Sequence, residues 1–305
     1  MSLKTNLVFL IAIILAFLFV INFNIYDIIP RTNETCDCDK LEHCYFNNII
    51  NIDKLTKPKI FIHMNERASI SELSQLCVES LMKYCYRQYD IILYTNKDVP
   101  RMINDQDDEL CNIENVELLG GQDLKQWEEY CKFKIIYKYG GVVMRPYFLF
   151  SQCPKYEEFC PERLKICRVN NEGVSVSNKL IIPSFCYMIA APKGDETTSV
   201  YLDYLRKKCQ HNYTSDIKHF DKTFEKLHYL DSFSEESIGI VDSNRSLIHL
   251  ENVLSSENIS FASNNYCLFI NIDLLSKKRH QGWILNMSKE QILETNTLLS
   301  NYAKL

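Results

Sequence analysis

The order of β-rich and helical segments after Pro58 constrains the fold more than any other feature of this sequence. Lys59–Met64 (KIFIHM) and Tyr89–Tyr94 (YDIILY) are rich in β-branched and aromatic residues and predict two strands. Apolar residues recur at helical spacing over Ser69–Cys85, which predicts a helix between them. A second helix is predicted over Gln122–Tyr139. Strands and helices alternating in this way favour an α/β layer with a parallel sheet.

A pair of glycines separates the second helix from the next predicted strand. Gly140 follows the helix directly, and glycine is favoured just past a helix C-terminus. Gly141–Phe150 and Val116–Leu119 predict two further strands. Later in the chain we expect strands over Leu164–Val169 and Leu180–Ala190, and helices over Thr197–Cys209 and Ser288–Leu305. The last of these begins with Ser288 and Gln291 in capping-box positions.

Composition sets the size of the core and excludes one class of partner. The chain has 305 residues, of which 46% are hydrophobic and 24% charged. That is enough for one large domain, or one domain plus an anchor. The net charge is −5 at pH 7. A nucleic-acid-binding protein carries a basic patch or stripe, so we expect no nucleic-acid partner.

The N-terminus carries a long apolar run. Leu7–Ile21 is fifteen uninterrupted apolar residues, and Leu3–Ile25 reaches the length of a bilayer core when Lys4 snorkels. A cleaved signal peptide is the alternative, but Asn22–Arg31 offers no small-x-small cleavage site. We therefore expect an uncleaved signal-anchor that contacts the lipid bilayer through residues 3–25.

This anchor divides the chain into three parts. We expect residues 1–25 to be a cytosolic tip and transmembrane anchor, residues 26–57 a cysteine-bearing stem, and residues 58–305 the folded domain. The single lysine before the span favours a cytosolic N-terminus, as in a type II membrane protein. The predicted locations are the lumen of the secretory pathway, the cell surface or a virion membrane.

Cysteine usage also favours export. All thirteen cysteines follow the apolar run, a density that is normal for an oxidising compartment. The odd count leaves at least one thiol free or paired between chains, and the connectivity stays open. Some of these residues are expected to be small buried hydrophobes instead. Five N-glycosylation sequons fit a lumenal glycoprotein, although roughly four would arise by chance in so Asn-rich a chain; they lie at Asn33, Asn212, Asn244, Asn258 and Asn286.

One segment resembles a known sugar-nucleotide motif. Glu129–Gly141 (EYCKFKIIYKYGG) is similar to the central motif of the DxD sugar-binding glycosyltransferases, in which an acid, an Arg and an aromatic precede Tyr-Gly-Gly. Lys132 stands at the Arg position, and Tyr139, Gly140 and Gly141 match outright. In that family the following strand ends in Asp-x-Asp, which binds the metal.

The two metal-binding aspartates of the family fall on Arg145 and Tyr147 in this chain. A closer resemblance covers most of residues 58–305. It is to the glycosyltransferase-like membrane proteins of large DNA viruses that lack Asp-x-Asp. The stretches that carry it are Ile62-His63, the helix CVESLMKYC, Arg145–Leu149 and the tail Ile272–Leu305. Both resemblances imply a GT-A-like, Rossmann-like mixed sheet flanked by helices.

The resemblance implies a set of donor-binding residues, and each has a plainer alternative. Glu129 would bond the donor ribose or sugar hydroxyls with Lys132 near phosphate, or the two form an ordinary ion pair three residues apart on a helix. Arg145 would replace the metal by binding diphosphate, or it is a solvated residue before a turn. His63 at a strand end is a candidate base or a structural hydrogen-bonding residue. Tyr139 and the glycine pair complete the set.

A metal ion is not expected. Transferases that use Mn²⁺ or Mg²⁺ hold it with carboxylates placed just past a strand. Asp105–Glu109 has suitable spacing, but no apolar strand leads into it, so a solvated acidic loop is the better interpretation. Asp195-Glu196 opens a predicted helix, where acids favour the helix dipole. A metal site therefore requires an acidic pair that the sequence does not reveal.

Two function classes remain open. In the first, the chain is a catalytically degenerate transferase used as a membrane-displayed binding or structural protein, for instance in a viral envelope. In the second, it is an active, metal-independent glycosyltransferase that moves a sugar from a nucleotide donor to a glycan or protein. Loss of one electrostatic element can cost about 10²–10³ in rate, which favours the first class. The sequence identifies neither donor, acceptor nor oligomeric state.

Overall fold

The computed structural model describes part of the chain. The described residues are 49–64, 71–103, 110, 121–167, 186–211, 231–278 and 280–305. Tyr45–Leu305 form one compact unit. The predicted anchor over residues 3–25 and the strand predicted over Val116–Leu119 lie outside the described residues. Within the described ranges, no helix combines the length and apolar character that a membrane crossing requires.

A six-stranded mixed sheet forms the centre of the domain, with strand order β2-β1-β3-β6-β5-β7. β1 pairs in parallel with both β2 and β3, whereas β6 runs antiparallel to β3 and to β5. β7 pairs in parallel with β5. The α/β class with a sheet flanked by helices is therefore confirmed. The strands are β1 Lys59–His63, β2 Asp90–Tyr94, β3 Gly141–Met144, β5 Lys165–Ile166, β6 Met188–Ala191 and β7 Asp231–Ser232.

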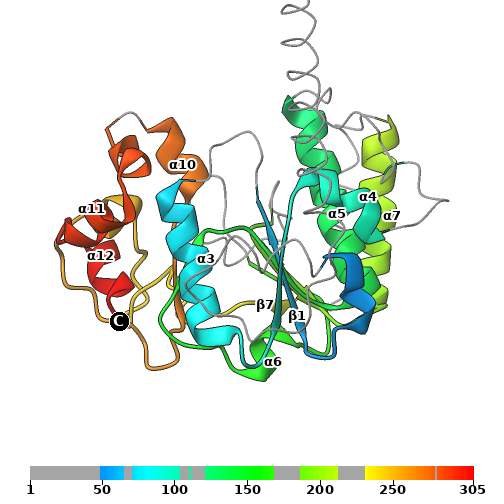
Figure 1. The fold of residues 1–305 in the computed structure, drawn as a ribbon, viewed down its shortest axis with the longest axis horizontal. Coiled ribbons are helices and arrows are strands. Elements are labelled where there is room, and N and C mark those ends of the chain that lie inside the picture. Colours follow the sequence, from blue (N-terminus) through cyan, green and yellow to red (C-terminus); the bar gives the residue numbers. More distant parts are fainter. Residues whose placement is uncertain are drawn as a thin grey trace, which may run out of the picture. The chain divides into compact units, whose positions relative to one another are not determined.

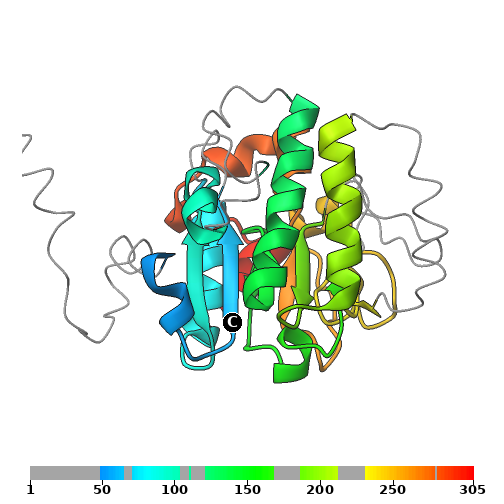
Figure 2. The ribbon, with the colours of Figure 1, turned by 90° about the vertical axis from the view of Figure 1, so that its right-hand side faces the viewer.

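Helices cover both faces of this sheet (Figures 1 and 2). Side chains alternate between the two faces of a strand, so in β1 Ile60 and Ile62 join a core that includes Val78 and Leu81 of α3. Phe61 joins the opposite core with residues of α5 and α7. The helices on these faces are α3 Glu72–Cys85, α5 Gly121–Tyr139 and α7 Glu196–His211, with the short η1 Ile49–Lys54, η2 Asn96–Asp98 and α4 Val99–Ile103.

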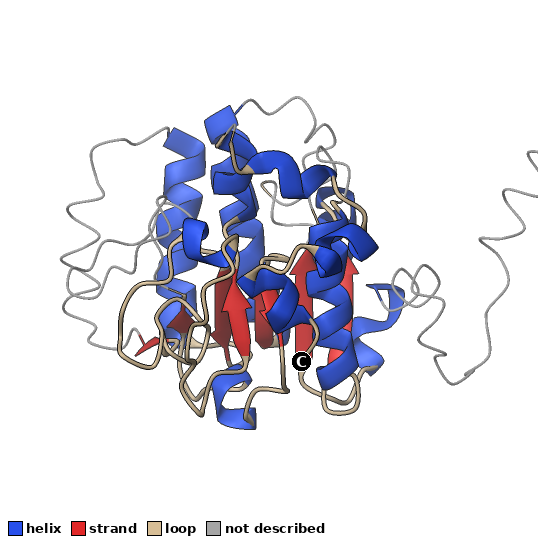
Figure 3. Ribbon diagram, turned by 90° about the vertical axis from the view of Figure 1, so that its left-hand side faces the viewer, coloured by secondary structure: helices blue, strands red, loops and turns tan. Residues whose placement is uncertain are grey.

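The C-terminal part packs beside this layer (Figures 1 and 3). A second sheet pairs β4 (Phe148–Phe150) antiparallel to β8 (Cys267–Phe269). Leu149 of β4 and Leu268 of β8 belong to a third core. The short helices here are α9 Leu250–Val253, α10 Ile272–Lys277, η4 Gly282–Asn286, α11 Lys289–Glu294 and α12 Leu298–Ala303. The short helix α6 Tyr156–Phe159 instead contributes Phe159 to the core that includes Ile60 of β1.

The prediction of one strand over Gly141–Phe150 is wrong in an informative way. The chain leaves the main sheet after Met144 and enters the second sheet at Phe148. Between them lies a tight turn in which the Tyr147 amide donates to the Arg145 carbonyl at 2.8 Å. The turn contains Pro146, which has no N–H for a strand ladder. This break therefore places Arg145 and Tyr147 at the end of β3.

The C-terminal helix is also divided. Ser288 and Gln291 form the predicted capping box, but the helix stops at Glu294 and a new one starts at Leu298. Asn296 has φ +51°, a left-handed conformation that ends a helix. The single helix predicted over Ser288–Leu305 is thus two short helices.

Candidate functional site

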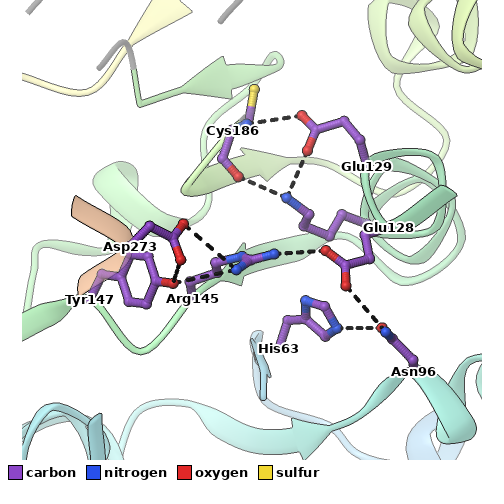
Figure 4. Close-up of polar contacts among 9 residues, drawn as sticks. His63, Asn96, Glu128, Glu129, Arg145, Tyr147, Cys186 and Asp273 are labelled. Carbon is purple, nitrogen blue, oxygen red and sulfur yellow. Dashed lines mark hydrogen bonds and ion pairs between the residues drawn. The ribbon is translucent and has the colours of Figure 1, made fainter. Parts of the chain in front are cut away.

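The carboxyl ends of the three parallel strands meet at one end of the sheet (Figure 4). His63 is the last residue of β1, Asn96 follows β2, and Arg145 follows β3 directly. In open α/β sheets, ligands bind outside the carboxyl ends of the strands. Two of the predicted site residues, His63 and Arg145, therefore lie in the expected region.

Arg145 is buried and paired with carboxylates. Its Nη2 donates to Glu128 Oε2 of α5 at 2.7 Å, and its Nη1 donates to the Tyr147 hydroxyl at 3.4 Å. Nη1 also lies 3.9 Å from Asp273 Oδ2 of α10. Only 5% of Arg145 is exposed, so the alternative of a solvated arginine before a turn is wrong.

The surroundings of Arg145 keep it charged. Burial would by itself lower the pKa of the guanidinium, but Tyr147, Glu128 and Asp273 raise it, and the net pKa lies above its ordinary value. A buried cation is tolerated only when it is paired and hydrogen-bonded. Glu128, which the sequence reasoning did not select, is the partner that meets this condition most closely.

The pair continues into a chain of hydrogen bonds toward β1 and β2. Asn96 Nδ2 donates to Glu128 Oε1 at 3.2 Å, and Asn96 Oδ1 lies 2.7 Å from His63 Nε2. His63 is buried and stacks on Tyr94 with ring centroids 5.0 Å apart. The geometry gives His63 the structural hydrogen-bonding position. Its contact with Asn96 ties the end of β1 to the loop after β2.

On its other side the network reaches the surface through α10. Tyr147 donates its hydroxyl hydrogen to Asp273 Oδ1 at 2.7 Å. The Asp273 side chain is 41% exposed, whereas the side chains of Arg145 and Glu128 are 6% and 4% exposed. Asp273 is therefore the point at which this network meets solvent. Burial, together with the nearby Asp273 carboxylate, also raises the pKa of the neighbouring Tyr187 to about 12.

Glu129 and Lys132 form a second, separate clamp on α5. Lys132 Nζ donates to Glu129 Oε2 at 2.7 Å and to the Cys186 carbonyl at 2.9 Å. The Cys186 amide in turn donates to Glu129 Oε1 at 3.0 Å. Both side chains are buried. The ion pair predicted as the plainer alternative is present, and it fixes the backbone just before β6.

Tyr139, Gly140 and Gly141 lie at the opposite end of the sheet. Gly141 begins β3 and Arg145 follows its last residue, a separation of about 13 Å along the strand. Gly140 closes α5 by donating its amide to the Ile136 carbonyl at 2.7 Å. The Tyr139 hydroxyl donates to the Met102 carbonyl of α4. The structure thus does not bring these three residues together with Arg145, although the motif groups them.

The glycine pair has a steric reason of its own. Gly140 and Gly141 have φ of +69° and +96°, where side chains are disfavoured. A Cβ on Gly141 would lie 2.2 Å from the Lys59 carbonyl oxygen. The close approach of β3 to β1 therefore requires glycine at this position.

The acidic residues considered as metal ligands do not form a metal site within the described residues. Within the described ranges, no group of three or more His, Cys, Asp or Glu side chains is placed to hold a metal ion. Asp195 caps α7, since its Oδ2 accepts from the Thr198 amide at 2.7 Å. Its predicted role as a helix start is confirmed. The acidic loop Asp105–Glu109 lies outside the described residues.

Comparison with known proteins adds no family. No protein-family model matches the sequence, and no curated protein matches it. The fold and the site define an α/β protein with a six-stranded mixed sheet. At the carboxyl end of its parallel strands, a buried guanidinium is paired with one buried and one partly exposed carboxylate.

Proposed function

We propose that this chain is a single-pass type II membrane protein whose domain has a GT-A-like, glycosyltransferase-derived fold without transferase activity. It acts as a membrane-displayed binding or structural protein, of the kind found in viral envelopes. The sheet order and the sequence resemblance over residues 58–305 support the ancestry. The burial of Arg145 and its pairing with Glu128 support the loss of activity.

The observation that supports this proposal most directly is the ion pair between Arg145 Nη2 and Glu128 Oε2, which lie 2.7 Å apart. Transfer of a sugar from a nucleotide donor leaves negative charge on a diphosphate, and that charge needs a cation to stabilise it. Arg145 stands where the family places its metal ligands. Here Glu128 and Asp273 both lie beside the guanidinium.

The charge of this network opposes a diphosphate. Two carboxylates face one guanidinium, so the network as a whole is negative. Phosphate oxygens would meet repulsion from Asp273 at the exposed side of the network. Glu129 and Lys132 use their charged atoms on each other and on Cys186. These contacts favour a structural use of the residues that the family directs at its donor.

Nucleotide binding tests this proposal. The full chain, purified in detergent, is titrated by calorimetry with UDP- and GDP-sugars, with and without Mn²⁺, and donor hydrolysis is followed in parallel. We expect neither heat of binding nor hydrolysis. Saturable binding with release of free sugar would instead support the active transferase.

Arg145→Lys separates the two classes further. Lysine keeps the positive charge but loses the bidentate geometry with which Arg binds phosphates. If Arg145 replaces the metal, this change weakens donor binding and hydrolysis. If the protein is inactive, it alters stability alone. The exposed Lys125→Arg on α5 is the matched control.

A further inference from the structure

A pair of thiols, separate from the site above, lies where α3 meets the segment after β4. Cys85 is the last residue of α3, and Cys153 follows β4 by three residues. Both belong to the core cluster that includes Tyr89 and Phe159. Cys85 and Cys153 both carry free thiols in the structure.

The backbone holds these two positions side by side. The Phe150 amide donates to Ser80 Oγ of α3 at 2.9 Å, which fixes β4 against the middle of the helix. Cys85 lies five residues after Ser80, and Cys153 lies three residues after Phe150, so both cysteines are close in the sequence to this shared contact.

Each backbone is also anchored near its cysteine. The Cys85 carbonyl accepts from the amides of Gln88 and Tyr89, both at 3.0 Å. Ser151, two residues before Cys153, donates its amide to the Tyr266 carbonyl at 3.0 Å. A disulfide between these thiols would therefore join two anchored segments of the backbone.

The side-chain contacts select this pair over a third nearby thiol. The Cys85 and Cys153 thiols are close enough to influence each other's pKa. The pKa of Cys160 is instead influenced by Tyr156. Tyr89 lies close to all three thiols.

We propose that Cys85 and Cys153 form a disulfide bond that joins the C-terminus of α3 to the segment after β4. The oxidant is a small-molecule or protein disulfide, for which oxidised glutathione is the probe. This bond would close a loop of roughly 70 residues that contains β2, α5, β3 and β4. The bond would restrain the segment that passes from the main sheet to the second sheet. This inference goes beyond the proposed function and does not depend on it.

The exchange proceeds in two balanced steps. The Cys153 thiolate attacks one sulfur of oxidised glutathione and forms a mixed disulfide, and one glutathione thiolate leaves. The Cys85 thiolate then attacks the Cys153 sulfur and expels the second glutathione. Two protein thiols lose two electrons, one glutathione disulfide gains them, and the two thiol protons end on the two glutathiones.

The order of attack follows from exposure. Cys85 is fully buried, and burial raises the pKa of its thiol far above the ordinary value. Cys153 is half-buried, and the neighbouring Cys85 opposes part of the rise in its pKa. The thiolate is the nucleophile, so Cys153 reacts first.

Peptide mapping tests the pair directly. The full chain in detergent is incubated with oxidised glutathione, alkylated and digested without reduction. We expect a linked peptide that contains Cys85 and Cys153, about 2 Da lighter than its two free-thiol peptides together. It should disappear after reduction. Alkylation of both residues after oxidation, or a link from either to another cysteine, would overturn the proposal.

Variants supply a second readout. Cys153→Ser should remove the linked peptide and lower the Tm of the oxidised protein by about 5–10 °C, with a small effect on the reduced protein. Cys85→Ser should do the same, and Cys153→Ser keeps the test open if the buried variant fails to fold. Cys160→Ser is the matched control and should retain both the linked peptide and the Tm. An oxidised Tm equal to that of the wild type in Cys153→Ser would contradict the bond.

Discussion

Arg145 Nη2 and Glu128 Oε2 lie 2.7 Å apart, and both side chains are almost fully buried. The pair joins the end of β3 to the first half of α5, 17 residues away in the sequence. A guanidinium placed to meet a ligand would keep free donors toward solvent. Arg145 directs Nη2 to Glu128 and Nη1 to Tyr147. We therefore expect the guanidinium mainly to stabilise the fold at the carboxyl end of β3.

Removal of the Arg145 charge should therefore destabilise the domain strongly. Arg145→Met leaves Glu128 buried without its cation, and breaking one side of a buried pair costs about 3–5 kcal/mol. Urea unfolding of the full chain, followed by fluorescence, measures this loss.

The double variant Glu128→Gln/Arg145→Met is the control for that result. It removes both charges, while the glutamine carbonyl can still accept from Asn96 Nδ2. We expect it to recover most of the lost free energy of unfolding, since replacing a buried pair as a whole is often neutral. Additive losses in the double variant would show that the two residues do not act as a pair.

The clamp on Cys186 yields a second prediction. Lys132→Met leaves the buried Glu129 carboxylate without its cation and the Cys186 carbonyl without the Lys132 donor, and should cost about 3–5 kcal/mol. Lys125→Met, at an exposed position of the same helix, should stay within about 0.5 kcal/mol of the wild type. Chemical denaturation compares the two. Equal unfolding midpoints for both variants would refute the structural role of Lys132.

The main elements around these residues could be predicted from the sequence because their patterns are local. α5 and β1 lie where the sequence pattern and a glycine stop signal place them, whereas β6 begins at Met188, well after the predicted start at Leu180. His63 lies at a strand end as predicted, whereas Arg145 follows the end of β3 within a segment predicted to be one continuous strand. Pro146 marks the break between β3 and β4 in the sequence itself, because proline has no N–H for a strand ladder.

The partners of the site residues could not be predicted in the same way. Glu128 and Asp273 contact Arg145 across 17 and 128 positions of the chain, and no local pattern encodes such contacts. Glu128 also precedes Glu129, which the family motif emphasises, so the motif directed attention to the neighbouring residue. Exposure was likewise invisible, because a lone Arg before a proline reads as a surface residue.

Gly141 supports a third prediction, about packing rather than charge. An Ala Cβ there would lie 2.2 Å from the Lys59 carbonyl oxygen, which forces β1 and β3 apart. With the strained backbone at φ +96°, Gly141→Ala should cost about 3 kcal/mol or more.

Gly194 offers the matched comparison. It also has a positive φ, +73°, but nothing lies within 4 Å of its Cβ position. Gly194→Ala should therefore cost only the conformational strain, about 1–2 kcal/mol. Thermal unfolding of the two variants separates the steric effect from the backbone effect, and equal Tm values would exclude the close approach.

Removing the hydroxyl groups of two buried tyrosines should change the free energy of unfolding in different ways. Tyr147→Phe removes the hydrogen bond to Asp273 and should cost about 1–3 kcal/mol. The Tyr94 hydroxyl is buried and has no hydrogen-bond partner among the described residues. Tyr94→Phe should be neutral or stabilise the protein by up to about 1 kcal/mol, because it removes an unsatisfied group. A large loss in Tyr94→Phe, measured by urea unfolding, would contradict this assignment.

The surface contact of Glu251 should make a small part of the stability depend on pH. Hydrogen bonds from Lys278, and then from Gln281, lower the pKa of Glu251 to about 2. Because the folded pKa is depressed, the contribution of this group is fully present above the unfolded pKa of about 4.3. It is lost as the pH falls through about 2. The Glu251 side chain is 59% exposed, so solvent screening limits the effect to below about 1 kcal/mol.

Glu251→Gln measures this contribution directly. The difference in the free energy of unfolding between the wild type and Glu251→Gln should be largest at pH 6 and should shrink as the pH approaches 2. Added salt should reduce it at pH 6, since the pair is exposed. Glu294→Gln, at an exposed position of α11, serves as the control and should match the wild type throughout. A difference for Glu251→Gln that stays constant from pH 6 to pH 2 would mean that its ionisation does not stabilise the contact between α9 and the end of α10.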